Sequence, residues 1–320
     1  MNITHNITHY TQHAIRDVSW DELAPSLSSQ EGALWVDITA PGESDLALLE
    51  SVFHFHPLAL EDTRNQKQRP KVEEFADHLF IILNPLNADD GAITDRELDV
   101  FVGNNYIVTV HSDAEPVIHA AQNRIDPNRL PFPISATYLL YVLFDTVVDG
   151  YFPILESIEN EIDVLGTQLL DHPYPKMLSR FFQLKQSLNQ IWRIVWPQRD
   201  VVSVLMNHEL VFIDHKSQYY LRDIGDHLAR IADTAQTARD AIPSLINLYM
   251  SAVSNRLNHA INRLTLFTIV IGVLAVFGGF YGMNFQRTWP PFESDWGVPV
   301  VLMMMAGLSA LLLTLLRRDR

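Results

Sequence analysis

The sequence predicts an α+β domain at the N-terminal end, followed by long stalk helices and then by two transmembrane helices. Three observations support this fold class. Short apolar stretches separated by turn residues dominate the first third of the 320 residues. From about Ser135 onward, apolar residues recur at the spacing of a helix. Near the C-terminal end, residues 264–281 and 296–316 contain no charge, and a helix of about 20 apolar residues spans a bilayer.

Residues 1–134 are predicted to form an α/β domain, because strand-like and helix-like stretches alternate there. The strand-like stretches are 33–39, 78–86 and 97–111, the last being a hairpin that turns at Gly103-Asn104-Asn105. Residues 44–53 have helical spacing, and Ser44 is placed to cap that helix.

The N-terminal repeat NITHNITH is polar and rich in β-branched residues. We expect it to be a disordered tail. On a helix, His5, His9 and His13 would instead align as a patch for a soft metal ion.

Residues 135–214 are predicted to form a cytoplasmic helical region. One helix covers 135–170 with a kink at Pro153, and a second covers 176–206 with Pro197 inside it.

A third helix begins near Tyr219 and shows no loop signal before Gly282, so residues 215–263 are predicted to be a stalk that continues into the first membrane span. Its apolar residues alternate in steps of three and four, as in a heptad seam: Leu221, Ile224, Leu228, Ile231, Ala235, Ala238, Ile242, Leu245 and Tyr249. This pattern leaves open whether the seam packs within its own subunit or against copies of itself around a symmetry axis.

Two successive uncharged helices favour membrane spans at 264–281 and 296–316 over buried core helices, whose apolar runs rarely exceed about 14 residues. Basic residues flank the pair on one side: Arg256, Arg263, Arg317, Arg318 and Arg320. Because Lys and Arg favour the cytoplasmic side, we expect an integral two-pass protein with both termini in the cytoplasm, in the inner membrane if the source is a bacterium. The loop at 282–295 then faces outward, and residues 317–320 form a basic cytoplasmic tail.

Composition excludes several classes of function. The chain has no cysteine, so it forms neither a disulfide framework nor a thiolate metal site. Its formal charge of −15 argues against nucleic-acid binding and fits a surface that attracts cations. No P-loop, nucleophile elbow or HExxH motif is present, so nothing indicates an enzyme or a cofactor.

The stretch YYLRDIGDHLARIADTAQTARDAI, followed by LINLYMSAVSNRLN and FYGMNF, resembles the CorA family of divalent-cation transport proteins. The resemblance includes PLALEDTRNQKQRPKVEEFADHLFIIL and YFPILESIENEIDVL, and it runs from about Trp35 onward. It implies a funnel-shaped homopentameric channel in which 264–281 lines the pore. It also implies passive uptake of Mg2+, often with Co2+ or Ni2+ tolerated, so Mg2+ would be both substrate and regulatory ligand.

The Gly282-Met283-Asn284 signature, with Tyr281 before it, is the expected pore mouth. Mg2+ dehydrates reluctantly, so a ring of neutral Asn284 oxygens suits its hydration shell better than a carboxylate cage. Gly282 permits unusual backbone angles. Met283 packs rather than binds, because a thioether is too soft for Mg2+.

Other pore residues are expected on either side of the span. In the outer loop, Glu293 and Asp295 would raise the local cation concentration or simply be solvated. At the cytoplasmic end, Ile261 and Leu264, with Asn258 nearby, are gate candidates, since apolar rings block ions by dewetting. Many members of the family carry a Met-Pro motif about ten residues before the signature, whereas this chain has Ile271-Gly272-Val273.

The resemblance also implies a regulatory Mg2+ site between neighbouring subunits. Its matching residues are Asp62, with Glu61 beside it, and Asp223. The alternative is that Asp62 caps a helix or pairs with Arg64 or Arg69. Asp149 is a further candidate for a second site, although Gly150 follows it where relatives often have a second acid.

Two rival functions also fit these residues. The first is a Zn2+ transporter of the ZntB type, possibly coupled to protons, although such relatives usually vary the Gly-Met-Asn signature that is intact here. The second is a two-helix membrane receptor or scaffold, which would carry no ion flux.

Overall fold

A computed structural model of the chain describes residues 4–12, 14–29, 31–89, 92–126, 134–207, 210–213, 218–283, 289–291 and 295–318. The chain divides into two compact units. The first comprises Met1–Gln168 and Tyr174–Ile246, and the second comprises Leu169–Pro173 and Asn247–Arg320.

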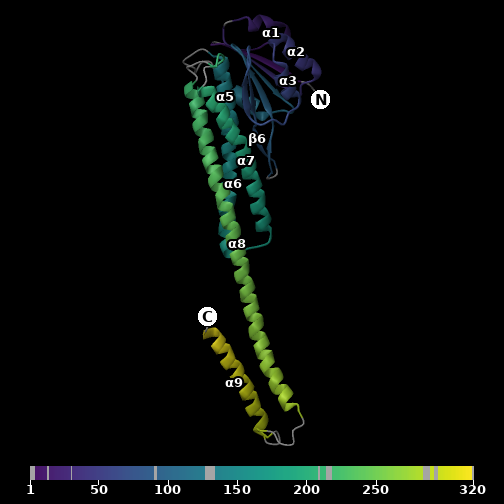
Figure 1. The fold of residues 1–320 in the computed structure, drawn as a ribbon, viewed down its shortest axis with the longest axis vertical. Coiled ribbons are helices and arrows are strands. Elements are labelled where there is room, and N and C mark those ends of the chain that lie inside the picture. Colours follow the sequence, from purple (N-terminus) through teal and green to yellow (C-terminus); the bar gives the residue numbers. More distant parts are fainter. Residues whose placement is uncertain are drawn as a thin grey trace. The chain divides into compact units, whose positions relative to one another are not determined.

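The first unit is built on a mixed sheet (Figure 1) with the strand order β2-β1-β3-β9-β8-β5-β4. Its strands are β1 Thr4–Tyr10, β2 Ile15–Asp17, β3 Ala33–Thr39, β4 Lys71–Glu74, β5 Leu79–Leu83, β8 Leu98–Val102 and β9 Tyr106–His111. β3 and β9 run parallel, and the other neighbouring strands run antiparallel. β6 Leu86–Asp89 and β7 Ala92–Asp95 form a separate ladder.

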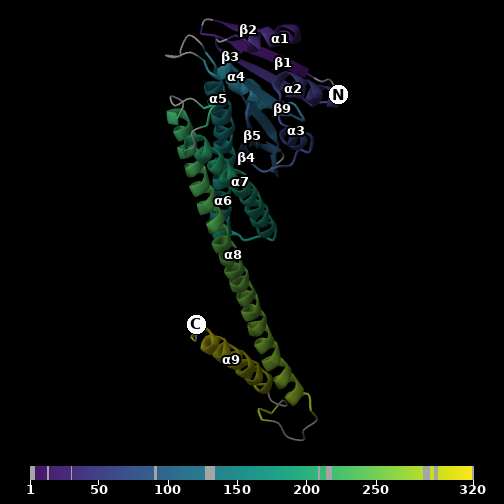
Figure 2. The ribbon, with the colours of Figure 1, turned by 45° about the horizontal axis from the view of Figure 1, so that its top comes forward.

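Helices cover both faces of this sheet (Figure 2), which is why its central strands are apolar at nearly every position. One face packs against α1 Trp20–Leu27, α2 Glu43–Phe53 and α3 Pro57–Arg64, which share one buried core with it. The other face contacts α5 Ala136–Asp149, which in turn packs against α4 Pro116–Arg124.

The predicted strand at 33–39 and the hairpin at 97–111 are confirmed as β3 and the β8–β9 pair. The hairpin turn needs Gly103, because a Cβ there would lie 2.3 Å from the Tyr106 ring. The strand predicted for 78–86 is confirmed over Leu79–Leu83 as β5, but its predicted end is wrong. β5 ends at Leu83 and β6 begins at Leu86, with Pro85, which has no N–H to donate, between them.

The expectation of a disordered N-terminal tail is also wrong. Residues 4–10 form β1, which pairs with the full length of β3 and buries Ile7 and Tyr10. The β-branched repeat therefore acts as a strand signal. His5 contacts the Asp45 carboxylate at 3.1 Å and His9 bonds the Glu31 carbonyl at 2.9 Å, so neither belongs to a helical metal patch. His13 lies outside the described residues.

Two other sequence expectations need correction. Gly42, not Ser44, is the N-cap of α2, and its N–H donates to Asp45 Oδ2 at 2.6 Å. The helix predicted for 135–170 is two helices that meet at Gly150 rather than a single helix kinked at Pro153. Pro153 lies in the first turn of α6, where its missing N–H costs nothing.

Four long helices complete the described chain: α6 Tyr151–Asp171, α7 Lys176–Asn207, α8 Gln218–Tyr281 and α9 Gly297–Arg318. The predicted helix at 176–206 with Pro197 inside it is confirmed as α7. The uninterrupted third helix is confirmed as α8.

The apolar seam of α8 packs within its own subunit, which is one of the two arrangements that its heptad pattern allowed. Leu221, Ile224, Leu228 and Ile231 are fully buried within the single chain. Gly225 of α8 lies 3.5 Å from Val202 of α7 at its Cβ position, and the Tyr220 ring is 4.8 Å from the Tyr141 ring of α5. The seam therefore packs inside its own subunit.

Three described helices are long and apolar enough to cross a membrane. The most apolar part of Ala136–Asp171 is 61% buried inside the chain, as expected for a helix that covers a sheet. The corresponding parts of Tyr219–Tyr281 and Gly297–Thr314 are only 6% and 11% buried.

We predict that Tyr151→Phe destabilises the first unit. The buried Tyr151 hydroxyl donates to the Asn84 carbonyl and accepts from Gln198 Nε2, both at 2.8 Å. Loss of the hydroxyl leaves two buried polar groups without this partner, which costs about 1–3 kcal/mol. The thermal unfolding temperature of the purified full-length protein should fall by several degrees. Tyr174→Phe is the matched control, because its hydroxyl is exposed, and an equal effect of both changes would contradict the prediction.

Candidate functional site

The Gly282-Met283 part of the signature closes the C-terminal end of α8. The Gly282 N–H donates to the Gly278 carbonyl at 2.9 Å, and the Met283 N–H donates to the Phe280 carbonyl at 3.3 Å. A Cβ at Gly282 would lie 2.9 Å from the Gly278 oxygen. Glycine is thus required by this close approach and not, as expected, by an unusual φ.

The outer loop is described only in part. Asn284, which was predicted for the pore mouth, and Glu293, which was predicted to attract cations in the loop, lie outside the described residues. Asp295, the other acid of the loop, is exposed. The Tyr281 hydroxyl donates to the Trp289 carbonyl at 2.8 Å. This bond ties the end of α8 to the described part of the loop.

The predicted gate residues lie on α8 within the second unit. Asn258, Ile261 and Leu264 recur every three residues, so they share one side of the helix, and all three are exposed, Leu264 to 67%. The hydroxyls of Thr265 and Thr268 donate to carbonyls one turn back, at 2.9 Å each. These threonines therefore add little polarity to the surface of the helix, and among the described residues nothing buries Leu264.

The predicted sensor residue Asp62 has an internal cation. Lys71 Nζ lies 2.6 Å from Asp62 Oδ2 and 2.7 Å from Glu73 Oε1. Burial lowers the pKa of Lys71, but the hydrogen bonds to Asp62 and Glu73 outweigh burial and raise it. The alternative expectation that Asp62 pairs with Arg64 is wrong, because Arg64 pairs with Glu43 at 2.8 Å.

Glu61 is exposed on α3, and Asp223 on α8 has a side chain that is 56% exposed. No ion pair or hydrogen bond between described residues joins Asp62 to Asp223 within one chain. A shared metal ion would therefore require a second copy of the chain or a rearrangement.

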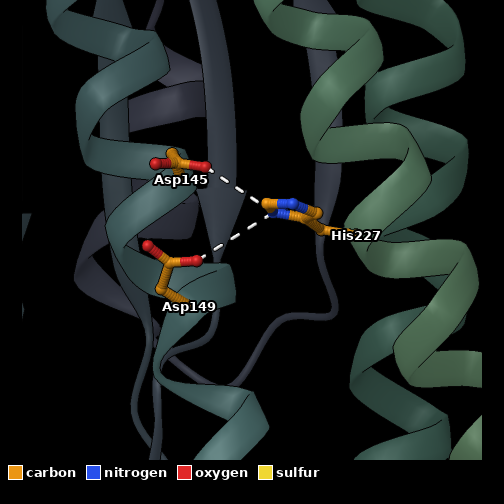
Figure 3. A group of neighbouring side chains, drawn as sticks. All are labelled: Asp145, Asp149 and His227. Atoms are coloured by element: carbon orange, nitrogen blue, oxygen red, sulfur yellow. Dashed lines mark ion pairs between the residues drawn. The ribbon is translucent and has the colours of Figure 1, made fainter.

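Figure 3 shows a cluster that the sequence did not single out as a group: Asp145 and Asp149 on α5, and His227 on α8. His227 Nδ1 lies 3.9 Å from the Oδ1 atom of each aspartate. Arg124 of α4 holds the other oxygens. It bonds Asp145 Oδ2, and it lies 3.0 Å from Asp149 Oδ2. The three potential ligand atoms lie within 4.8 Å of one another, so this group could hold a metal ion.

Burial shapes the electrostatics of the cluster. The Asp145 side chain is only 5% exposed, and its Oδ1 has no hydrogen-bond partner among the described residues. Burial and then the neighbouring Asp149 carboxylate raise the pKa of Asp145, although Arg124 and His227 oppose this shift. A cation at the open Oδ1 side would relieve both effects.

The spacing of Asp145 and Asp149, four residues apart in a helix, was a signal in the sequence. The same spacing relates Asp223 and His227. What the sequence did not contain was the packing of α8 beside α5, which brings the two pairs together.

A family model described as CorA-like Mg2+ transporter protein matches residues 30–318. The chain belongs to this family. The CorA-family chain is 34% identical over 290 residues to the cobalt/magnesium transport protein CorA of Thermotoga maritima, covering 89% of this chain and 82% of that protein. It is also 20% identical to the zinc transport protein ZntB of Yersinia enterocolitica, covering 88% of this chain and 86% of that protein.

The fold agrees with this membership. The complete structure of the CorA magnesium transporter from Methanocaldococcus jannaschii superposes with a TM-score of 0.84 at 20% identity, and the match covers 100% of this chain and 99% of that one. This CorA-family protein is therefore a divalent-cation transport protein of the membrane, with an α/β domain, long helices and apolar C-terminal helices.

Proposed function

We propose that the chain forms a homopentameric channel for passive uptake of hydrated Mg2+, with Co2+ and Ni2+ as further cargo. The supporting observation is the bare apolar surface of α8 beyond Asn247. Large side chains around this helix are exposed, among them Leu264, Phe267, Ile271, Val276 and Phe280. Such a surface is unstable in water, and both lipid and further copies of α8 would cover it.

The proposed topology has two spans, α8 from residue 264 to 281 and α9 from 296 to 316. The apolar part of Ala136–Asp171 is excluded as a third span because its own chain buries it. Arginines beside the spans support a topology with both termini in the cytoplasm. In this arrangement residues 1–263 are cytoplasmic and 282–295 face outward, where Glu293 and Asp295 attract cations.

At the pore mouth, five Asn284 side chains would offer neutral oxygens to the waters of Mg2+. The end of α8 at Tyr281 supports this placement, because Gly282 and Met283 close the helix and Asn284 follows them in the sequence. A hydrated ion is bound weakly by such a ring, which permits rapid release.

Asn284→Ala should abolish Mg2+ uptake while the oligomer remains intact, because the ring loses all of its side-chain acceptors. Mg2+ flux into proteoliposomes, combined with the mass of the purified complex, measures both properties. Asn104→Ala, in the exposed β8–β9 turn, is the matched control. Normal flux through well-assembled Asn284→Ala protein would remove Asn284 from the filter.

Leu264 and Ile261 are the proposed gate. Five copies of each would form apolar rings at the cytoplasmic end of the pore, and such rings exclude water and ions when they are narrow. The structure supports this proposal in that neither side chain is buried by its own chain, so both are available to a symmetric contact.

Leu264→Ser should leak ions even when the internal Mg2+ concentration is high, because the small side chain removes the apolar surface of the ring and widens it. Single-channel or liposome conductance measured in the closed condition tests this. Leu311→Ser, at an exposed position of α9, controls for the loss of an apolar side chain elsewhere in the membrane. If closed-state conductance stays at the wild-type level in Leu264→Ser, the gate lies elsewhere.

The proposed sensor consists of Asp62 and Asp223 from neighbouring subunits, with Glu61 beside them. Without Mg2+ these acids repel each other and favour opening, and bound Mg2+ bridges them and favours closure. Lys71 supports a weak site, because Mg2+ must compete with an ammonium group that already neutralises Asp62. A weak site suits a sensor that responds at the Mg2+ concentration of the cytoplasm.

Changing Asp62 and Asp223 together to Asn should remove most of the Mg2+-dependent protection from proteases, because the two carboxylates that Mg2+ would bridge are gone. Conduction should persist, since the pore is unchanged. The double change Asp21→Asn and Asp200→Asn removes the same formal charge from exposed positions and is the control. Protection that still rises with millimolar Mg2+ as in wild type would refute the sensor.

Zn2+ transport coupled to protons is the alternative. The intact Gly-Met-Asn signature favours Mg2+, and the lower similarity to the zinc transporter agrees with this. Uptake assays with competing metals, with and without a pH gradient, separate the two functions.

A further inference from the structure

A cavity of about 550 Å3 in the first unit is lined by α7 and by the loops that lead into β4 and β8. Its volume lies in the range of about 300–1,000 Å3 that is typical of pockets for small molecules. Four of the side chains that line it are basic: Lys67, Arg69, Arg96 and Arg193. They come from three separate segments, so the fold gathers these cations in a chain whose formal charge is −15.

Most of the hydrogen-bond donors of these cations are unused. Lys67, Arg69 and Arg193 are exposed, and no ion pair or hydrogen bond between described residues involves their side chains. Arg96 donates only from Nη1, to the Ala114 carbonyl at 3.1 Å. A guanidinium has five donors in a planar fork that matches the oxygens of phosphates and carboxylates. The cavity therefore presents groups that suit an anion.

The wall also contains three carboxylates, and two of them accept hydrogen bonds from other groups. Glu97 Oε2 accepts from the backbone N–H groups of Lys67 and Gln68, at 2.5 Å each. Asp95 Oδ1 accepts from a glutamine side chain of α7 at 2.8 Å. The third is Asp113, which is exposed. Glu97 and Asp95 thus hold the wall together, and the formal charge of the lining remains +1.

The backbone of the same wall is strained. Lys67 has a φ of 131°, which residues other than glycine rarely adopt. Strained residues persist where the surrounding structure holds them, and they are concentrated at ligand-binding sites. Here the two hydrogen bonds to Glu97 hold the strained segment in the cavity wall.

A buried acceptor in the wall lacks a partner. Asn84 is only 2% exposed, and its Oδ1 has no hydrogen-bond partner among the described residues. Its backbone carbonyl already accepts from the Tyr151 hydroxyl. Because buried polar atoms normally have a partner, a ligand that carries a hydroxyl group beside its negative charge would complete this wall.

We propose that this cavity binds a small anion that contains a diphosphate group, supplied either by a nucleotide or by inorganic pyrophosphate. The cations lie on three separate segments, and an anion with two charged groups can contact more of them than a single phosphate can. The ribose of a nucleotide would also offer Asn84 a hydroxyl donor. The site goes beyond the proposed function, because it needs neither the pore nor a neighbouring subunit.

Isothermal titration calorimetry of the purified full-length protein in Mg2+-free buffer tests the site, with ADP, pyrophosphate and orthophosphate as probes. We expect saturable binding of ADP or pyrophosphate at one anion per subunit, and binding of orthophosphate that is at least about tenfold weaker. Tighter binding of ADP than of pyrophosphate would support the contact between Asn84 and the ribose. Equal binding of the two would support a site for the diphosphate group alone.

Arg193→Gln and Arg69→Gln should each weaken the binding by about tenfold, because each removes a charged hydrogen-bond donor from the cavity. Both residues are exposed, so the unfolding temperature should stay close to that of the wild type. Arg16→Gln is the matched control. Arg16 is exposed on β2, at the opposite edge of the sheet from β4, and its replacement removes the same charge.

Two results would overturn the proposal. One is the absence of saturable binding of both ADP and pyrophosphate at millimolar concentration. The other is an affinity in Arg193→Gln and Arg69→Gln equal to that in Arg16→Gln, since the cavity would then have no special part in binding. The readout does not depend on transport, so diphosphate binding by a protein without Mg2+ flux would refute the channel but not this site.

Discussion

The burial of one stripe of α8 is the constraint on which the rest of this protein depends. Leu221, Ile224, Leu228 and Ile231 are removed from water by helices of the same chain. At about 1.5–3 kcal/mol for each fully buried aliphatic side chain, this seam holds the first part of α8 firmly in the first unit. Because α8 then continues without interruption to Tyr281, the helix proposed to line the pore begins in a helix already fixed by packing.

The same helix has the opposite character beyond Asn247. There its large apolar side chains are exposed, and so are those of α9. A soluble monomer rarely exposes so much apolar surface. The two parts of this one helix therefore differ in surface chemistry, and the exposed apolar part is the surface that lipid or further copies of α8 would cover.

Charge pairing inside the first unit follows a common pattern. Asp62 is paired with Lys71, and Asp145 and Asp149 are paired with Arg124. Each group of acids therefore keeps its shape without a metal ion and retains only part of its negative charge. Weak, reversible cation binding is the expected consequence, because a divalent ion gains less from a half-neutralised site. His227 of α8 lies 3.9 Å from both Asp145 and Asp149, whereas no described ion pair or hydrogen bond joins Asp62 to α8.

The sequence alone determined the periodic elements and the functional signature. Local patterns predicted the apolar runs, the heptad seam of α8, the hairpin around Gly103 and the family membership. Each of these depends on residues that are close together in the chain. The strand at 4–10 was missed, because its stability comes from pairing with β3 and not from its own composition. Tertiary structure also decided that the α8 seam is internal, that Asp62 has Lys71 as its partner, and that Asp145, Asp149 and His227 meet. These outcomes depend on contacts between residues up to 82 positions apart, and such contacts are set by how the helices and the sheet pack, for which local spacing carries no signal.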